Sequence, residues 1–206
     1  MTQTVPPHAD LPQEGSELLV LDPDPLVNDH LSRLRQFFRV TAATSIGSAV
    51  EYLRRTPRKC QFVISDVQVN GQDTFDVFRA AKAVEMGPTI LVTTADVERV
   101  PDALISGGDA VLLKPFAPNL LFSRLGRLKQ ERAARIDLPR DLASEKAHQL
   151  RERTSAALGG QLGVALPFDH CPHCNASPVT SFDFVSHRRA WYACLACKKV
   201  WIANHL

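Results

Sequence analysis

Four short apolar runs have the length of buried strands, and each is followed by a side chain that can take part in chemistry. The side chains are two carboxylates, Asp22 and Asp66, a hydroxyl from Thr93 or Thr94, and the ammonium of Lys114. The runs that precede them cover residues 18–21, 62–65, 89–92 and 110–113. Chemistry in open α/β sheets collects outside the carboxyl ends of the strands. We therefore expect these four groups to converge at one edge of one sheet.

Helical patterns separate the strand-like runs. Residues 25–38 have apolar residues at helical spacing with Pro25 in the first turn. Similar patterns cover residues 45–55, 73–84, 98–105 and 118 to about 135, and a weaker strand is expected at residues 40–42. Five strands that alternate with five helices through short connections predict an α/β fold with one doubly wound, five-stranded parallel sheet.

Residues 17–130 resemble the receiver domain of bacterial two-component response regulators. The resemblance rests on four segments in the family's order and spacing: LLVLDPDP, FVISD, ILVTTA and LLKPF. It implies the flavodoxin-like strand order 2-1-3-4-5. It also implies that Asp66 is the phosphoacceptor and that Thr94 and Lys114 contact the phosphoryl group. The Mg²⁺ site that it implies comprises Asp22, Asp24, Asp66 and Gln68.

The chemistry of phosphoryl transfer agrees with these roles. A carboxylate that attacks a phosphohistidine or a small phosphodonor needs positioning, and the charge on the phosphoryl oxygens must be neutralised. Mg²⁺ held by carboxylates and a backbone carbonyl supplies part of that neutralisation, and Lys114 supplies a point charge. Pro115 restricts the backbone of Lys114 towards extended geometry. The alternative is that these residues are remnants of an inherited fold, because an Asp after a strand often begins a turn.

Three departures from the family pattern bear on the phosphoacceptor role. The family has two adjacent acidic residues after the first strand, and here Pro23 stands second, so Asp24 would have to serve as the metal ligand. Val111 occupies the position of the family's aromatic switch residue and has no ring to rotate. The loop after Asp66 also lacks the family's Pro and Gly, and instead contains Val69, Asn70, Asp73 and Thr74.

Four of the five cysteines form the strongest metal-binding pattern in the chain. Cys171 and Cys174 make one Cys-x-x-Cys pair, Cys194 and Cys197 make another, and 19 residues lie between the pairs. Without a secretion signal this pattern indicates metal binding rather than disulfides, and four thiolates complete a tetrahedral Zn²⁺ shell. Apolar and aromatic pairs near residues 182–184, 191–192 and 200–201 predict three strands. We therefore expect a zinc ribbon whose small core depends on the metal.

Composition and charge set the wider class. Hydrophobic residues make up 45% and charged residues 22%, which is ordinary globular usage. Residues 1–123 carry 11 Lys/Arg and 15 Asp/Glu, whereas residues 124–206 carry 13 and 7, so an acidic part precedes a basic one. A basic part indicates either an anionic partner or a solvated helix face. No apolar run is long enough for a bilayer and the N-terminus lacks a signal-peptide layout, so we expect a cytoplasmic protein without a membrane partner.

The expected domain organisation has four parts. They are a disordered leader at 1–16, a receiver-like domain at 17–130, a helical linker at 131–166 and a zinc ribbon at 167–206. The linker is interpreted as amphipathic helices with basic outer faces, and a homodimer formed through these helices is the alternative. Cys60, outside the ribbon, is expected to be buried and inert.

These features predict a two-component signalling protein that is not an enzyme. In the first hypothesis, a sensor histidine kinase or a phosphotransfer protein phosphorylates Asp66, and the ribbon is the output. In the second, the chain is an adaptor that works without phosphorylation, which Pro23, Val111 and the altered loop favour. Arg188 and Arg189 lie near aromatic residues, so the ribbon's partner could be nucleic acid. A protein partner ranks first because the C-terminal half has no helix-turn-helix pattern.

Overall fold

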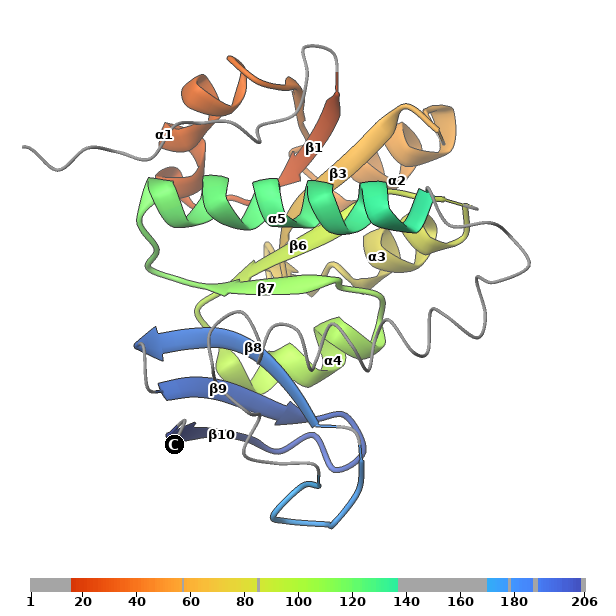
Figure 1. The fold of residues 1–206 in the computed structure, drawn as a ribbon. Coiled ribbons are helices and arrows are strands. Elements are labelled where there is room, and N and C mark those ends of the chain that lie inside the picture. Colours follow the sequence, from red (N-terminus) through yellow and green to blue (C-terminus); the bar gives the residue numbers. More distant parts are fainter. Residues whose placement is uncertain are drawn as a thin grey trace, which may run out of the picture.

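The computed structural model describes residues 16–56, 58–84, 86–136, 170–177, 179–186 and 189–204. The expected leader, apart from residue 16, and the linker beyond residue 136 lie outside these residues. The described part contains a five-stranded parallel sheet, a three-stranded antiparallel sheet and a short two-stranded hairpin (Figure 1). The predicted fold class, a doubly wound parallel sheet with a small additional β module, is confirmed.

The parallel sheet has the strand order that the family resemblance implies. Its strands are β1 (Glu17–Leu21), β2 (Arg39–Ala42), β3 (Cys60–Asp66), β6 (Thr89–Thr94) and β7 (Ala110–Leu113), in the order β2-β1-β3-β6-β7. The helices of this part are α1 (Pro25–Leu34), α2 (Ile46–Arg55), α3 (Phe75–Lys82), α4 (Val100–Ile105) and α5 (Pro118–Ile136). A 3-10 turn, η1 (Val97–Arg99), leads directly into α4.

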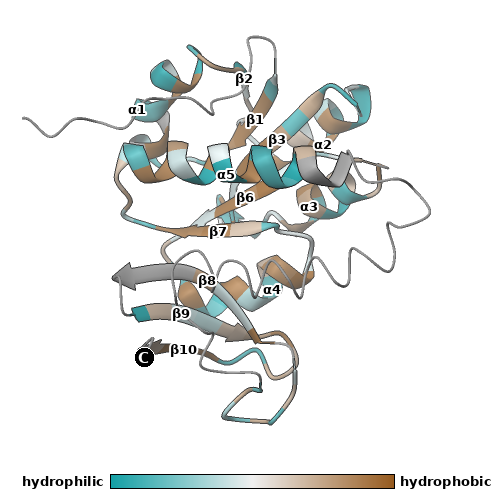
Figure 2. Cartoon of the chain, viewed as in Figure 1, coloured by the Kyte–Doolittle hydropathy of each residue, from teal (hydrophilic) through white to brown (hydrophobic). Residues whose placement is uncertain are grey.

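Alternation of side chains along the strands produces two apolar clusters, one on each face of the sheet. On β1, Leu18 and Val20 pack with α1 and α5, whereas Leu19 and Leu21 pack with α2, α3 and α4. Every residue of β6 is buried, as expected for a parallel strand covered on both faces. The strands are predominantly apolar in Figure 2, and the helices carry polar residues on their outer sides. This double core positions the carboxyl ends of the strands.

The bounds of α1 and α2 differ from the predicted ones, and each difference has a local cause. Ser45 lies just before α2, and its hydroxyl accepts a hydrogen bond of 3.1 Å from the backbone N–H of Ser48. Helix α1 ends at Leu34 instead of residue 38, and a hydrogen-bonded turn follows it. Phe38 is nevertheless buried, with its ring 5.8 Å from that of Phe62. The apolar pattern of residues 25–38 is longer than the helix because Phe38 packs in the core from the turn that follows α1.

A hairpin after β3 was not predicted. Strands β4 (Gln68–Val69) and β5 (Gln72–Asp73) pair antiparallel, so α3 begins at Phe75 instead of residue 73. Asn70 and Gly71 form the two-residue turn between them, with φ of 53° and 76°. A turn with both central residues in the left-handed region strongly favours the Asn-Gly pair. That pair is the signal in the sequence that identifies the hairpin.

The C-terminal module is a three-stranded antiparallel sheet. Its strands β8 (Val179–Ser186), β9 (Arg189–Cys194) and β10 (Val200–Asn204) run in the order β10-β9-β8. All three lie where the aromatic and apolar pairs predicted strands. The sheet lies beside β7 and α4 of the parallel-sheet part (Figure 1). Across the described ranges, no helix has both the length and the apolar character needed to cross a membrane.

Candidate functional site

Three of the four strand-end groups predicted to converge lie together. The Nζ atom of Lys114 is 2.7 Å from Oδ1 of Asp22 and 2.7 Å from Oδ2 of Asp66. Asp24 completes the group, because its Oδ2 lies 3.4 Å from the same ammonium. Lys114 follows β7 and Asp22 follows β1, while Asp66 ends β3. The parallel topology thus brings residues from three distant segments to one edge of the sheet.

Asp22 is the most deeply buried carboxylate of this cluster. Its Oδ2 accepts a 2.5 Å hydrogen bond from the hydroxyl of Thr93, and its Oδ1 accepts a 2.9 Å bond from the backbone N–H of Asp24. Burial raises the pKa of Asp22 above its ordinary value, against the opposing effect of the hydrogen bonds from Lys114 and Thr93. Asp22 is therefore an anchor for the ammonium and has little contact with solvent.

Lys114 remains an ammonium in this environment. Burial acts to lower the pKa of Lys114, but hydrogen bonds to Asp22 and Asp66 outweigh it and raise the pKa above the ordinary value. The lysine side chain is only 8% exposed. The carboxylate of Asp66 is 18% exposed, so it is the more accessible partner in the Asp66–Lys114 ion pair.

The backbone around Asp66 is held from two sides. The hydroxyl of Thr74 donates a 2.5 Å hydrogen bond to the carbonyl oxygen of Asp66. The backbone N–H of Gln68 donates to Oδ1 of Asp66 at 3.3 Å, and the Gln68 side chain donates to Asp73 at 3.1 Å. Thr74 is fully buried, which makes it a positioning residue that the sequence analysis missed.

Thr94 does not join the cluster. Its hydroxyl accepts a 3.0 Å hydrogen bond from the backbone N–H of Asp96, and its link to Lys114 is through the backbone, where the Thr94 carbonyl oxygen accepts a 2.8 Å hydrogen bond from the Lys114 N–H. Thr93 contacts the site instead, through Asp22, and it lies opposite Asp66 in the parallel register of β3 and β6. Because neighbouring strand residues point to opposite faces, only one of the two threonines can contact Asp22.

A second cation lies beside the hairpin, and the sequence analysis did not identify it. The guanidinium of Arg99, in η1, pairs with the carboxylate of Asp73 and lies 5.5 Å from the centre of the Phe75 ring. Hydrogen bonds from Gln68 and then from Arg99 lower the pKa of Asp73. This ion pair ties the loop after β3 to the segment that leads into α4.

The carboxylates fit a divalent cation in their donor chemistry. Mg²⁺ takes oxygen ligands and is commonly bound through one or two carboxylates. Asp22, Asp24 and Asp66 all direct a carboxylate oxygen at the Lys114 ammonium. Three carboxylates against one ammonium leave net negative charge, which favours a further cation. Pro23 is exposed and provides no side-chain ligand.

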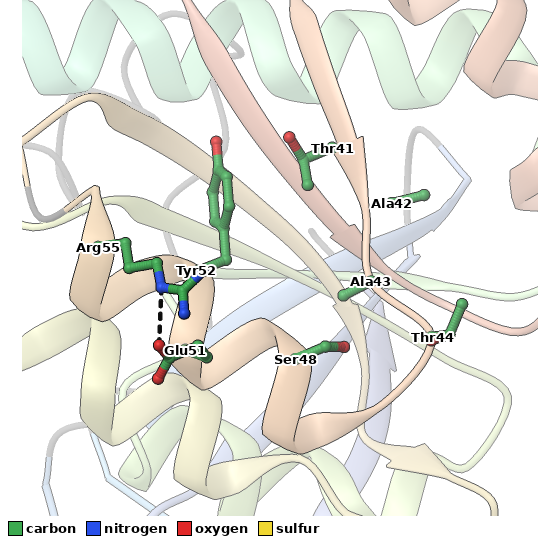
Figure 3. A pocket seen from close by; sticks show the side chains of 8 residues that line it. All are labelled: Thr41, Ala42, Ala43, Thr44, Ser48, Glu51, Tyr52 and Arg55. Atoms are coloured by element: carbon green, nitrogen blue, oxygen red, sulfur yellow. Dashed lines mark ion pairs between the residues drawn. The ribbon is translucent and has the colours of Figure 1, made fainter.

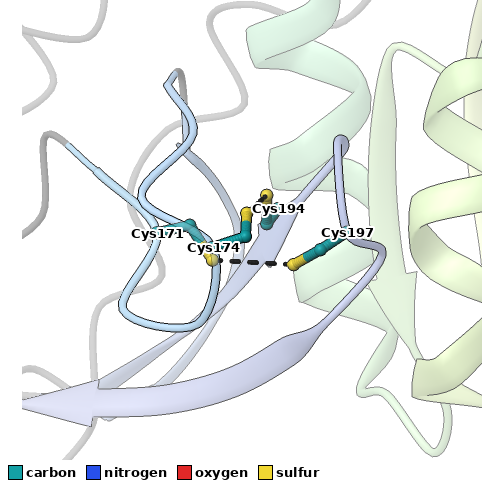
Figure 4. A group of neighbouring side chains, drawn as sticks. All are labelled: Cys171, Cys174, Cys194 and Cys197. Atoms are coloured by element: carbon teal, nitrogen blue, oxygen red, sulfur yellow. Dashed lines mark hydrogen bonds between the residues drawn. The ribbon is translucent and has the colours of Figure 1, made fainter.

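The four predicted cysteine ligands form one cluster in the C-terminal module. Their Sγ atoms all lie within 4.8 Å of one another (Figure 4). The closest contacts join the two Cys-x-x-Cys pairs, with 3.7 Å between Cys171 and Cys197 and 3.7 Å between Cys174 and Cys194. A tetrahedral zinc site with Zn–S bonds of about 2.3 Å has S···S edges of about 3.8 Å. The observed separations match that geometry and exceed the roughly 2.0 Å of a disulfide.

The two cysteine turns have equivalent backbones. The residue that follows each pair, Asn175 or Lys198, has a positive φ, 57° in the first turn and 58° in the second. Backbone N–H groups of Cys197 and Ala196 lower the pKa of the Cys194 thiol to about 7. A metal binds the thiolate, and a thiol with a pKa near neutrality readily supplies that form. In the other turn, the backbone of Ala176 acts to lower the pKa of the Cys174 thiol, but contacts with the neighbouring thiols raise it to about 12. It is therefore the geometry of the two turns that suits them to hold a metal ion.

The aromatic residues of the module pack internally. The Trp201 ring lies 5.9 Å from that of Tyr192 and 5.7 Å from that of His173, and Tyr192 is almost fully buried. Trp191 stacks on Phe182 with 6.2 Å between ring centres. These aromatic rings therefore contribute to packing within the module. His187, Arg188 and His205 lie outside the described residues.

A separate cavity of about 340 Å³ adjoins β2 and α2 (Figure 3). Its lining comprises Thr41, Ala42, Ala43, Thr44, Ser48, Glu51, Tyr52 and Arg55. Glu51 pairs with Arg55 at 2.7 Å, and the Tyr52 hydroxyl donates to Glu17 at 2.9 Å. None of the predicted site residues lines this cavity, and we assign it no function.

Comparison with known proteins gives a structural match only. No family model matches the chain, and no curated protein matches it. A probable two-component system response regulator/GGDEF domain protein is 21% identical with a TM-score of 0.50, covering 57% of this chain and 50% of that chain. A putative two-component system response regulator/ggdef domain protein is 21% identical with a TM-score of 0.51, covering 58% and 51%.

A third structure is a CheY-like response regulator receiver domain protein from Methanospirillum hungatei JF-1, with 18% identity and a TM-score of 0.49, covering 58% of this chain and 97% of that chain. This chain therefore spans about half the length of the first two structures. At 21% identity, the likeness to the first two structures establishes the fold alone. The parallel-sheet part of this chain has the fold of response regulator receiver domains.

Proposed function

We propose that this chain is a signalling protein whose receiver part accepts a phosphoryl group on Asp66 and whose C-terminal module binds Zn²⁺. The observation that carries the proposal is the Asp66–Lys114 contact of 2.7 Å at the carboxyl edge of the sheet. It combines a partly exposed nucleophile with a buried cation, which is what phosphoryl transfer to a carboxylate requires.

The proposed reaction needs few groups. A carboxylate oxygen of Asp66 attacks the phosphorus of a phosphohistidine or a small phosphodonor, so that an O–P bond forms as the bond from phosphorus to the donor breaks. The leaving group takes up a proton. Lys114 neutralises charge on the phosphoryl oxygens, and Thr74 holds the Asp66 backbone during the attack. Mg²⁺, when bound by Asp22, Asp24, Asp66 and the backbone of Gln68, adds further neutralisation.

Thr94 contacts the phosphoryl group in this proposal only if its hydroxyl changes orientation. Its hydroxyl now bonds the backbone of Asp96, so it must turn to reach a phosphoryl group on Asp66. That turn would pull on the segment from Thr94 to η1. The phosphodonor is proposed to be a sensor histidine kinase or a phosphotransfer protein, and the chain itself is proposed not to be an enzyme.

A phosphorylation-independent adaptor is the second candidate. The observation that favours it is the position of Lys114, whose ammonium already lies among the three carboxylates that would bind Mg²⁺. Pro23 stands at the metal-ligand position, and the ammonium offsets one of the three negative charges without a divalent ion. The ribbon's proposed partner is a protein, because its aromatic rings pack internally and are poorly placed to stack on bases.

Intact-mass analysis after incubation with acetyl phosphate and Mg²⁺ separates the two candidates. We expect the wild type to gain one phosphoryl group and Asp66→Asn to gain none. Asp76→Asn is the matched control, because Asp76 is an exposed carboxylate that pairs with Arg79 on α3. Its label should equal that of the wild type. An unlabelled wild type, under conditions that keep it folded, would establish the adaptor instead.

A further inference from the structure

The two edges of the parallel sheet have different surroundings. Strand β2 forms one edge and β7 the other. Beside β7 lies β8, the edge strand of the ribbon sheet, although the two strands belong to separate sheets (Figure 1). Strand β9 lies against α4. The ribbon thus covers the β7 edge, which would otherwise present unpaired backbone groups to other chains.

This covering is a packed interface. Phe182 of β8 and Ala193 of β9 are 6% and 0% exposed, and both belong to the apolar cluster that contains Val100, Ala103 and Val111. Val100 and Ala103 lie on α4, and Val111 lies on β7. An ion pair of 2.7 Å between Lys198 and Asp102 of α4 closes the contact at its rim. The receiver and the ribbon therefore share one core.

The contacts to the receiver lie next to the metal ligands in the sequence. Ala193 immediately precedes Cys194, and Lys198 immediately follows Cys197. The second cysteine turn is consequently fixed to α4 on both sides. The first turn reaches it through the two S···S contacts of 3.7 Å. A metal that joins the turns would therefore also hold the ribbon strands against the receiver.

We propose that metal loading of the four cysteines controls the β7–α4 side of the receiver. With the metal bound, the ribbon is folded and holds β7 and α4; without it, the ribbon opens and both elements loosen. This inference rests on the metal binding proposed above and does not depend on phosphorylation. Its consequence reaches the Asp66 cluster, because Lys114 follows β7 directly and Arg99 immediately precedes α4. The chain is thus a receiver whose two site cations are positioned by a distant metal.

Hydrogen exchange of the full-length protein tests the proposal. The metal-loaded protein is compared with protein stripped by a zinc chelator under reducing conditions, and exchange is followed by mass spectrometry. On metal removal we expect peptides covering α4 and β7 to exchange about tenfold faster or more, and those covering α1 and β2 to stay unchanged. Faster exchange confined to residues 170–204 would overturn the proposal, as would an equal increase in every element. Purified protein without stoichiometric metal would overturn both the inference and the metal site itself.

A variant away from the ligands tests the interface separately. Phe182→Ala removes the buried ring of β8 and leaves all four cysteines in place. We expect faster exchange in α4 and β7 even with metal bound and, because coupling between two sites is reciprocal, a zinc affinity lower by about tenfold or more. Ser181→Ala is the matched control on the same strand, and it should change neither quantity. Wild-type exchange and affinity in a folded Phe182→Ala protein would show that the shared core does not carry the coupling.

Discussion

The Asp66 cluster and the cysteine cluster achieve order in opposite ways. Asp22, Asp66 and Lys114 stand at the ends of strands fixed by two apolar clusters, and their opposite charges satisfy one another. The four thiols stand at the tips of two turns in a small three-stranded sheet, with 3.7 Å contacts that no covalent bond maintains. A ligand at the first cluster adds to a site that already exists. At the second, we expect a bound metal to stabilise the fold that holds it.

Removing one thiolate tests most directly whether the C-terminal module depends on a bound metal. Cys194→Ser should abolish stoichiometric zinc and the protease resistance of residues 170–204. The lost metal binding is a large term, about 10–16 kcal/mol in zinc-finger peptides. Elemental analysis and limited proteolysis provide the measurements. Cys60→Ala is the control, because Cys60 is buried in the parallel-sheet part, where burial raises the pKa of its thiol to about 12. If Cys194→Ser still carries one zinc per chain, the four-cysteine site is wrong.

Removal of the ammonium tests the other cluster. Lys114→Met removes the cation that Asp22 and Asp66 share and should lower the free energy of unfolding by about 3 kcal/mol in chemical denaturation. Lys82→Met is the matched control, since Lys82 pairs with Asp109 at a more exposed position and should lose at most about 1 kcal/mol. Equal effects in the two variants would mean that the Asp66 cluster is no more preorganised than a surface ion pair.

The difference in stability between the wild type and Lys114→Met should depend on pH. Burial opposes the ammonium, but hydrogen bonds to Asp22 and Asp66 raise the pKa of Lys114 above 10.5, so the folded protein holds this proton more tightly than the unfolded chain. The stabilisation is complete below pH 10.5 and is lost as the pH rises through the raised pKa. We expect the stability advantage of the wild type over Lys114→Met to shrink in that range. An advantage that grows with alkaline pH would contradict this sign.

A smaller change sharpens the role of Pro23. Pro23→Asp adds a carboxylate at an exposed position beside Asp22. It should raise the affinity for Mg²⁺ about tenfold, because affinity increases with the number of charged ligands. Labelling of Asp66 by acetyl phosphate should quicken accordingly. Calorimetric titration with Mg²⁺ and intact-mass time courses measure the two effects. If Pro23→Asp binds Mg²⁺ more tightly and remains unlabelled, the adaptor candidate gains support.

The smallest effect is expected at the rim of the shared core. Lys198→Ala removes the ion pair with Asp102. The side chains of Lys198 and Asp102 are both partly exposed. We expect a loss of stability below about 1 kcal/mol that disappears at high salt. Thermal unfolding at two salt concentrations measures it. A large, salt-independent loss would show that the ion pair contributes more to docking than the apolar contacts do.

Much of the parallel-sheet part could be predicted because its signals are local. Strand-length apolar runs and the polar residues after them determine which side chains stand at strand ends, and parallel topology places those ends at one edge. The positions of Asp22, Asp66 and Lys114 follow from this. The choice between Thr93 and Thr94 does not, since it depends on the register of β6 against β3. Arg99 was missed for a related reason, because its partner Asp73 is placed by a hairpin that was itself not recognised.

The ribbon shows the complementary limit of prediction. Cys-x-x-Cys spacing places sulfurs within reach of one ion, so the clustering of the four cysteines could be predicted. Its attachment to the receiver could not. Phe182 and Ala193 fit an internal ribbon core as well as a shared one, and no local pattern marks Asp102 as the partner of Lys198. Packing between distant segments decided the outcome.

The covered β7 edge also has a consequence for the order of events during synthesis. Strand β7 ends at Leu113, and its cover is completed only when Cys194 and Cys197 have been made. At about 5–20 residues per second, the intervening 80 or so residues take roughly 4–16 s. Throughout that interval the newly made sheet has a bare edge strand, the kind of surface that recruits other nascent chains. If the cysteines bind zinc and the metal holds the cover in place, as proposed, a shortage of zinc would extend this interval and lower the yield of folded protein.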